Sequence, residues 1–206
     1  MQVIDLPLEG LKLLRPQIFR DERGFLLESY QRARYRAAGV ECEFVQNNHS
    51  ESRLGTLHGL HYRSKPGQAK LVRCTRGRIF DVAVDIRPNS VTFGRWHGTL
   101  LDDVSHEQIF IPIGFAHGFC VLSDVAGVQY KVSAPYDAGP MSAPSRGTIR
   151  TSPWPGLSRI FSSQSVTGRS SASQRFGRVG KTYPGEFRHS HFAGAGYVIQ
   201  LRVAHE

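Results

Sequence analysis

Apolar and polar residues alternate through much of the segment 44–134, which predicts a series of short β-strands. In the stretch 78–86, Phe80 and Val82 fall on one face of such a strand, whereas Asp81 falls on the other. One face should therefore be core, and the other a partly polar interior or rim. We expect strands at 44–49, 56–62, 70–75, 78–86, 92–101, 108–112, 118–122 and 127–134. Short strands with turn residues between them are typical of an all-β sandwich or barrel.

The N-terminal region carries the signals of a hairpin and a helix. A charged turn around Gly24 separates two apolar runs, which predicts a hairpin. Ser29 stands where a helix N-cap would, and residues 31–38, rich in Arg and Ala, end at Gly39. We therefore expect an all-β fold with an N-terminal hairpin and one short helix.

Composition narrows the class of protein. The chain has 206 residues, of which 40% are hydrophobic and 21% charged, as in a globular protein with one main domain. No apolar run approaches the roughly 18 residues of a membrane span, and residues 1–14 lack the features of a secretion signal. Cys42, Cys74 and Cys120 are odd in number and widely spaced, which favours free thiols. We expect a cytoplasmic protein with no membrane partner.

The net charge of +9 raises the question of a nucleic-acid or other anionic partner. Residues 139–206 hold nine basic residues against two acidic ones, so +7 of this charge lies in the tail of the chain. The first 138 residues carry only +2. Because the part of the chain with the motifs is nearly balanced, we expect no nucleic-acid partner.

Ionisable residues gather in the segment 57–74, LHGLHYRSKPGQAKLVRC, where two strands are separated by a Pro-Gly turn. Rigid strands would hold His58, His61 and Lys70 at fixed positions, which suits proton transfer on a small substrate. An ideal strand points His58 and His61 to opposite faces, but a bulge at Gly59 would turn both inward. The alternative is a surface hairpin with solvated charges.

His117 and Tyr130 are further candidates. His117 follows a P-x-G turn in PIGFAHGF, a pattern that delivers a metal-ligating histidine in cupin jelly rolls. A metal would need a partner H-x-H motif, but Arg63 stands two positions after His61, so we expect no metal site. Tyr130 shares a strand face with two valines, where a tyrosine usually only packs.

Several motifs, taken together and in order, resemble the dTDP-4-dehydrorhamnose 3,5-epimerase family. They are FRDERGFLLESY (19–30), FVQNNHS (44–50), GLHY (59–62), KLVRCTRGRIFDVAVDIR (70–87), TFGRW (92–96) and IPIGFAHGFCVLS (111–123). The resemblance covers about residues 1–138. It implies a cupin-type double-stranded β-helix (jelly roll), free of metal and cofactor, that forms a homodimer. The implied reaction epimerises a dTDP-sugar, dTDP-4-dehydro-6-deoxy-D-glucose, at C3 and C5 to dTDP-4-dehydro-L-rhamnose.

The resemblance also implies residue roles. His61 would be the base, Tyr130 the acid, and Lys70 a cation that helps to hold the enolate. The chemistry fits independently, because a 4-keto group acidifies the hydrogens on C3 and C5 and a nearby cation stabilises the enolate. Substrate contacts would come from Arg23, Glu28, Gln46, Asn48, His58, His117 and Tyr136, with Arg23 facing the diphosphate. His58 stands where the family usually has Arg, so that a fixed positive charge becomes a titratable one.

The resemblance stops at Gly139, and residues 139–206 read as an aberrant basic tail. The family continues with a segment whose Asp orients the catalytic histidine, whereas no Asp follows Asp137 here. Translation in the wrong frame would explain this tail, because reading from the third base of the Gly139 codon can restore family-like sequence. In that frame the codons of Trp154-Pro155 must yield Ala. The alternative is a disordered basic appendage.

Two other functions stay open at this point. A 3-epimerase or ketoisomerase of a deoxysugar pathway would use the same base and enolate. A sugar-nucleotide-binding cupin with impaired catalysis is the alternative from a different class, because loss of an orienting carboxylate can cost several orders of magnitude in rate.

Overall fold

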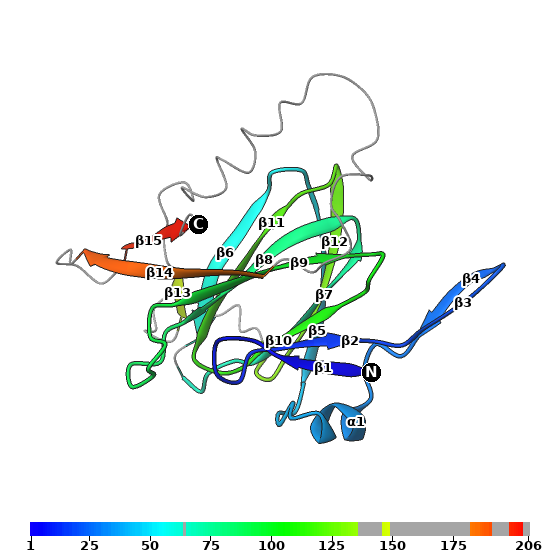
Figure 1. The fold of residues 1–206 in the computed structure, drawn as a ribbon, viewed down its shortest axis with the longest axis horizontal. Coiled ribbons are helices and arrows are strands. Elements are labelled where there is room, and N and C mark those ends of the chain that lie inside the picture. Colours follow the sequence, from blue (N-terminus) through cyan, green and yellow to red (C-terminus); the bar gives the residue numbers. More distant parts are fainter. Residues whose placement is uncertain (64, 136–145, 149–181, 191–197, 204–206) are drawn as a thin grey trace.

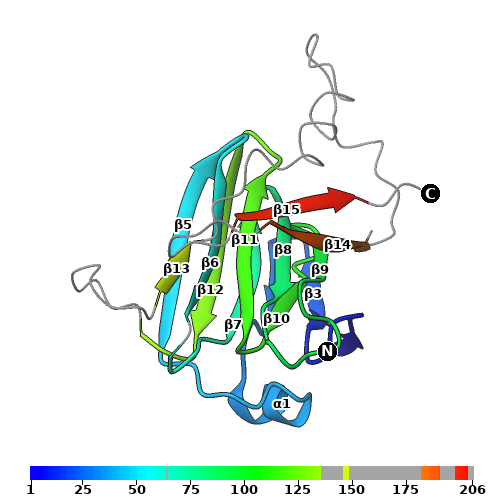
Figure 2. The ribbon, with the colours of Figure 1, turned by 90° about the vertical axis from the view of Figure 1, so that its left-hand side faces the viewer.

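The computed structural model describes residues 1–63, 65–135, 146–148, 182–190 and 198–203, and these form a sandwich of two antiparallel sheets (Figures 1 and 2). The first sheet has the order β1 (Gln2–Asp5), β2 (Lys12–Arg15), β10 (Gln108–Ile111), β7 (Lys70–Arg76), β12 (Val125–Val132) and β5 (Gln46–Arg53). The second has the order β13 (Arg146–Thr148), β6 (Leu57–Arg63), β11 (Phe115–Val121), β8 (Arg78–Asp85), β9 (Trp96–Asp102), β14 (Thr182–Ser190) and β15 (Val198–Val203). The all-β expectation is confirmed.

The main core lies between the two sheets. Ile79 and Ala83 of β8 face inward with Val72 of β7 and Ile109 of β10, and all four are fully buried. The intervening residues of β8 belong to a second cluster on the opposite face of the seven-stranded sheet, together with Leu60, Trp96, Ala116 and Cys120. The alternation in the sequence therefore separates two apolar layers, and Asp81 lies in the inner one, as the pattern predicted.

The N-terminal hairpin is present as β3 (Ile18–Asp21) and β4 (Gly24–Leu27). It pairs only with itself among the described strands and projects away from the two sheets (Figure 1). The short helix α1 (Arg32–Ala37) also forms and ends before Gly39, whose φ of +82° suits the left-handed turn after a helix.

The predicted N-cap at Ser29 is wrong. The N-cap is Gln31, whose side-chain Oε1 accepts a 2.6 Å hydrogen bond from the Arg34 backbone N–H. The carbonyl of Ser29 is already occupied, because it accepts hydrogen bonds from the Tyr35 hydroxyl at 2.9 Å and from Gln108 Nε2 at 3.0 Å. Ser29 thus anchors the helix to the outer face of the six-stranded sheet rather than starting it.

The predicted strand 92–101 begins four residues late, at Trp96. The reason is Asp85, whose buried carboxylate accepts hydrogen bonds from the hydroxyls of Ser90 and Thr92 at 2.6 Å each, and two from the Arg87 side chain. These bonds fold the stretch before Trp96 into turns. Smaller differences are an early start of β11 at Phe115 and the separate strands β1 and β2, which the loose alternation before residue 18 did not resolve.

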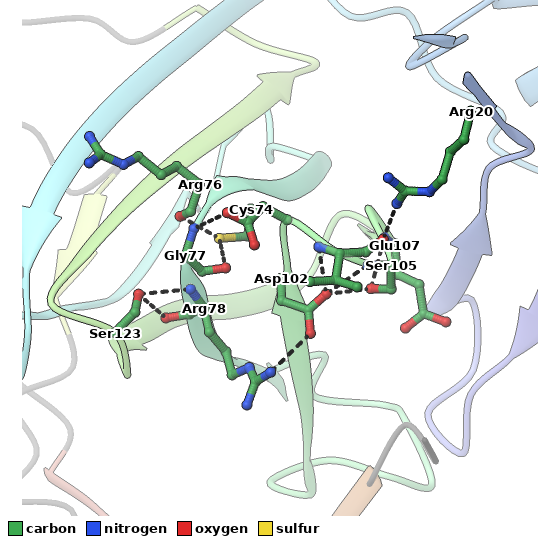
Figure 3. A network of polar contacts seen from close by, with 11 residues as sticks. Arg20, Cys74, Arg76, Gly77, Arg78, Asp102, Ser105, Glu107 and Ser123 are labelled. Carbon is green, nitrogen blue, oxygen red and sulfur yellow. Dashed lines mark hydrogen bonds and ion pairs between the residues drawn. The ribbon is translucent and has the colours of Figure 1, made fainter. Parts of the chain in front are cut away.

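A polar network closes one end of the sandwich around the β7–β8 turn (Figure 3). Gly77 donates its backbone N–H to Asp103 Oδ2 at 2.7 Å, and its φ of +73° is one that glycine adopts without strain. Arg78 donates its backbone N–H to Ser123 Oγ at 2.8 Å, while its side chain lies 3.6 Å from Asp102 Oδ2. The network ties the turn to the loop after β9 and the loop after β11.

Only three stretches beyond residue 138 are described, and they are the strands β13, β14 and β15 at the two edges of the seven-stranded sheet. The remainder of the expected tail lies outside the described residues, so the division at residue 138 stays a prediction. Across the described part of the chain, no helix has the length and apolar character of a membrane span.

Candidate active site

Three histidines lie in one row across the inner face of the seven-stranded sheet. His61 of β6 pairs in register with His117 of β11, His117 pairs with Ala83 of β8, and Ala83 pairs with His97 of β9. Residues paired in this way share a face of the sheet. The next row includes Asp81, which lies diagonally from both His117 and His97. The fold therefore assembles ionisable side chains from four neighbouring strands.

The bulge expected at Gly59 is present, and it brings both β6 histidines to this face. His58 pairs with Phe119 and His61 with His117, so three steps along β6 match two along β11. Gly59 has a φ of +111°, and a Cβ there would lie 2.6 Å from Gly118 Cα and 2.7 Å from the His117 carbonyl oxygen. Only glycine fits this close approach of two backbones. His58 stacks on Phe119 with ring centroids 4.7 Å apart, and its Nε2 shares a 2.8 Å hydrogen bond with Ser52 Oγ.

Lys70, His117 and Asp81 form a buried chain of contacts between the sheets. His117 Nε2 lies 2.8 Å from Asp81 Oδ2, and since a carboxylate only accepts, this nitrogen carries the proton. His117 Nδ1 is then free to accept from Lys70 Nζ at 3.4 Å. Burial lowers the pKa of Lys70 to about 8 against the attraction of Asp81, which raises it. Burial also lowers the pKa of His117.

His61 is the accessible member of the row. Its side chain is exposed, in contrast to His117, which is 6% exposed. Partial burial, together with the charges of Lys70, His117 and His58, lowers the pKa of His61. At neutral pH its imidazole is therefore unprotonated, which is the form that can remove a proton from a substrate.

Tyr130 approaches from the opposite sheet. On β12 it pairs with Val72 of β7 and with Asn48 of β5, and it packs against the core between the sheets. Asn48 accepts a 2.7 Å hydrogen bond from Gln46 Nε2 on the same strand. The tyrosine and the two amide side chains thus face the histidine row from the six-stranded sheet.

Not all predicted substrate contacts join this group. Arg23 lies at the tip of the β3–β4 hairpin, where it forms an ion pair of 2.5 Å with Asp21 and its side chain is 84% exposed. Glu28, just after β4, accepts a 3.0 Å hydrogen bond from Arg34 of α1. The structure therefore places both residues away from the inner face on which the histidines lie. Tyr136 lies outside the described residues.

Two residues of this site, Asp81 and His97, were not predicted from the sequence. Asp81 was visible as an acid within an otherwise apolar strand, but its partner on β11 depends on strand register, which one strand does not reveal. His97 lies in the predicted strand 92–101, and no motif around it indicated a functional role. In the part of the chain that is described, no three His, Cys, Asp or Glu side chains gather in a way that could hold a metal ion.

Comparison with known proteins agrees with this architecture. The family model described as dTDP-4-dehydrorhamnose 3,5-epimerase matches residues 5–144. The dTDP-4-dehydrorhamnose 3,5-epimerase of Escherichia coli K12 is 51% identical over 138 residues, which cover 66% of this chain and 75% of that protein. The dTDP-4-dehydrorhamnose 3-epimerase of Streptomyces niveus is 42% identical over 139 residues, covering 66% of this chain and 67% of that protein.

A solved structure extends the likeness to three dimensions. The dTDP-6-deoxy-D-glucose-3,5-epimerase of Legionella pneumophila, crystallised with dTDP-4-keto-L-rhamnose, aligns with a TM-score of 0.68 and 45% identity. The alignment covers 72% of this chain and 77% of the Legionella chain.

Proposed function

Because the chain belongs to the dTDP-4-dehydrorhamnose 3,5-epimerase family, we propose that it epimerises dTDP-4-dehydro-6-deoxy-D-glucose at C3 and C5 to dTDP-4-dehydro-L-rhamnose. The observation that carries the proposal is the inner-face arrangement of an accessible, unprotonated His61 beside a buried cationic Lys70. A base next to a cation is what enolate formation beside a ketone requires.

At each carbon the reaction consists of two proton transfers, one to His61 and one from Tyr130. His61 takes the hydrogen from the carbon next to the 4-keto group, and the electron pair moves into the carbonyl to give an enolate. The Lys70 ammonium, held by the His117–Asp81 pair, stabilises the negative oxygen. Tyr130 then donates its hydroxyl proton to the same carbon from the other side. Exchange with solvent returns the proton to Tyr130 and removes it from His61.

The placement of base and acid on different sheets supports inversion. His61 belongs to the seven-stranded sheet and Tyr130 to the six-stranded sheet, so a sugar ring held between them meets one group on each face. Delivery of the new proton to the face opposite the lost one inverts the carbon. We assign Gln46, Asn48 and His58 to substrate contacts as well, because they lie on the inner faces of the two sheets. Both ring nitrogens of His117 are engaged by Asp81 and Lys70, so its assigned role toward the substrate acts through Lys70.

We further propose that the working unit is a homodimer in which the hairpin arm, residues 18–27, serves the neighbouring subunit. In the arm, Phe19 is 57% exposed and Leu26 is 72% exposed. Large apolar side chains exposed together are typical of a surface that another protein covers. Its tip carries Arg23, whose guanidinium suits a diphosphate. The hairpin itself projects away from the two sheets (Figure 1). Packing against a second copy would cover the apolar residues and bring Arg23 to that copy's site.

Mixed dimers test the arm directly. Arg23→Ala and His61→Asn each remove one required group, so each homodimer should be inactive or strongly impaired. Co-expression of the two variants should restore about a quarter of the wild-type rate, because half of the dimers are mixed and one of the two sites in each mixed dimer receives both intact groups. A mixture as inactive as its parents, or a monomer in sedimentation, would overturn the shared site.

A 3-epimerase is the second candidate, favoured by the similarity to the Streptomyces niveus protein. Proton NMR of dTDP-4-dehydro-6-deoxyglucose with the protein in D₂O separates the two. Deuterium entry at both C3 and C5 supports the 3,5-epimerase, and entry at C3 alone supports the 3-epimerase. Bound ligand without exchange at either carbon would favour a binding protein, because among the described residues no carboxylate bonds to His61.

A reducing, cytoplasmic setting also belongs to the proposal. Cys42, Cys74 and Cys120 are all free, and the last two are buried. Burial raises the pKa of Cys74 to about 12 and that of Cys120 to about 11, so both stay protonated thiols. A nucleotide-sugar enzyme with unpaired thiols fits a compartment in which disulfides are not formed.

A further inference from the structure

His97 is a buried histidine that the proposed reaction does not use. Its side chain is 1% exposed, and neither ring nitrogen has a hydrogen-bond partner among the described residues. Burial lowers its pKa to about 4 against the opposing effect of Asp81. A neutral imidazole with two unpaired nitrogens is costly in an interior, so its surroundings need an explanation.

The other unpaired atoms of this region lie beside it. Asp81 Oδ1 and Thr99 Oγ1 are buried and also have no partner among the described residues. Thr99 pairs in register with Asp81, and His97 lies two positions along β9, diagonal to the same carboxylate. Diagonal cross-strand neighbours lie within reach of long side chains. Three polar side chains, each with at least one buried atom that lacks a partner among the described residues, therefore lie next to one another on β8 and β9.

Asp81 sits symmetrically between two imidazoles. On its β11 side, Oδ2 accepts from His117 Nε2 at 2.8 Å. On its β9 side, Asp81 pairs with Thr99 and lies diagonal to His97, and its Oδ1 has no partner among the described residues. We propose that His97 is a positioning residue that donates an N–H to Asp81 Oδ1 through one enclosed water, and so controls the charge that Asp81 offers to His117 and Lys70.

The direction of the effect follows from the charges in this chain of contacts. The titratable groups that face it are Asp81 on β8, Lys70 on β7, and the neutral histidines His117 on β11 and His61 on β6. An N–H donated to Oδ1 draws negative charge away from Oδ2. Without it, the carboxylate attracts the Lys70 ammonium more strongly through His117, and Lys70 gives up its proton at a higher pH.

The inference deepens the proposed epimerase function, and its test has one arm that needs no turnover. In NMR spectra of the full chain with ¹⁵N-labelled histidine, His97 of the wild type should show one neutral tautomer with a slowly exchanging N–H. His117 should carry its proton on Nε2. A His97 ring that exchanges freely between tautomers would overturn the proposal even if the enzyme is inactive on every sugar tried.

The second arm compares variants. His97→Leu removes both nitrogens at similar volume, and it should shift the His117 ring signals and move the alkaline fall of kcat upward by about half a pH unit. His97→Gln keeps an N–H donor and should return both readouts toward the wild type. Leu101→Val, on the same strand and face, is the control for altered packing and should change neither. Unchanged His117 signals and pH profile in a folded His97→Leu protein would reduce His97 to a packing role.

Discussion

His61 on β6 lies directly across from His117 on β11, so the exposed imidazole that can act as a base is the register partner of the buried one that contacts Lys70. The pairing depends on a bulge in which His58, Gly59 and Leu60 span the distance of two ordinary residues. The base and the histidine that contacts the enolate-stabilising Lys70 thereby lie on a single pair of strands, and the geometry of the bulge becomes a target for experiment.

Substitution of Gly59 by alanine should disable the site. A Cβ would collide with the backbone of Gly118 and His117, so the bulge must open and His61 must move. A displacement of about 1 Å can cost about 10²-fold in rate, and we expect a loss of kcat of at least that order. Gly55→Ala is the matched control, because Gly55 also has a positive φ of +79° but nothing within 4 Å of its Cβ position. Equal losses in both variants would show that the bulge has no special role.

Lys70→Met should lower kcat by about 10²–10³-fold with little change in KM, because the ammonium acts mainly on the developing oxyanion. In the wild type, activity should fall as the pH rises through about 8, where Lys70 loses its proton. The variant should lack this alkaline limb. Lys131→Met, on the same sheet but its other face, should retain the wild-type profile. An alkaline limb that persists in Lys70→Met would assign it to another group.

Tyr130→Phe should separate proton removal from inversion. The ring keeps its packing against the core but can no longer donate a proton. We expect deuterium to enter the substrate in D₂O while the yield of inverted product falls by about 10²–10⁴-fold. Tyr62→Phe, which alters a tyrosine packed in the opposite layer of the neighbouring sheet, is the control. Normal inversion by Tyr130→Phe would require a different acid.

Asp85 should matter for stability rather than catalysis. Burial alone would raise the pKa of this carboxyl, but hydrogen bonds from Arg87, Ser90 and Thr92 outweigh it and lower the pKa to about 2. Because the folded-state pKa lies below the unfolded value of about 3.9, this stabilisation is present above pH 4 and is lost as the pH falls toward 2. Asp85→Asn should reduce the free energy of unfolding at pH 7 by about 2–3 kcal/mol, measured by urea denaturation.

The control for Asp85 is Asp5→Asn. Asp5 pairs with Lys12 at 2.6 Å, but its side chain is 81% exposed, so the change should stay within about 0.5 kcal/mol. A similar loss from both substitutions would mean that the turn before β9 does not depend on the buried carboxylate.

The tail beyond Gly139 can be tested at the level of the gene. The match to the family model ends at residue 144 of this chain, and the match to the E. coli relative covers 138 residues and 75% of that protein. We expect sequencing across codon 139 to reveal a single-base error or frame change that restores a longer match to the family. A clean in-frame read, together with tail peptides found by mass spectrometry of the purified protein, would rule this out.

Local patterns predicted much of this fold. The runs 70–75 and 78–86 were correctly predicted as strands, and the alternation in 78–86 separated the residues that lie on its two faces. Gly59 between two histidines indicated the bulge, because only a bulge reconciles their spacing with one face. Contacts between segments that are far apart in the sequence could not be predicted. The contact of Asp81 with His117 needs the register of β8 and β11, and the turn before Trp96 depends on a carboxylate seven residues upstream of Thr92.

The position of Arg23 relative to the two sheets could not be predicted from the sequence either. Family resemblance assigned it to the substrate, but nothing in the segment around Gly24 states that the hairpin leaves the body of the sandwich. The N-cap prediction at Ser29 was wrong because a long-range contact fixes this residue: its carbonyl accepts a hydrogen bond from Gln108, 79 positions away.

Strand β8 carries two buried carboxylates with different surroundings: Asp85 is saturated with hydrogen-bond donors, whereas Asp81 keeps one oxygen without a partner among the described residues. The loss of each therefore has a different consequence. Loss of Asp81 would leave the buried ammonium of Lys70 without its counter-charge, so it would disturb the chemistry and the interior together. Loss of Asp85 would instead release the turn before β9, at a distance from the reacting groups.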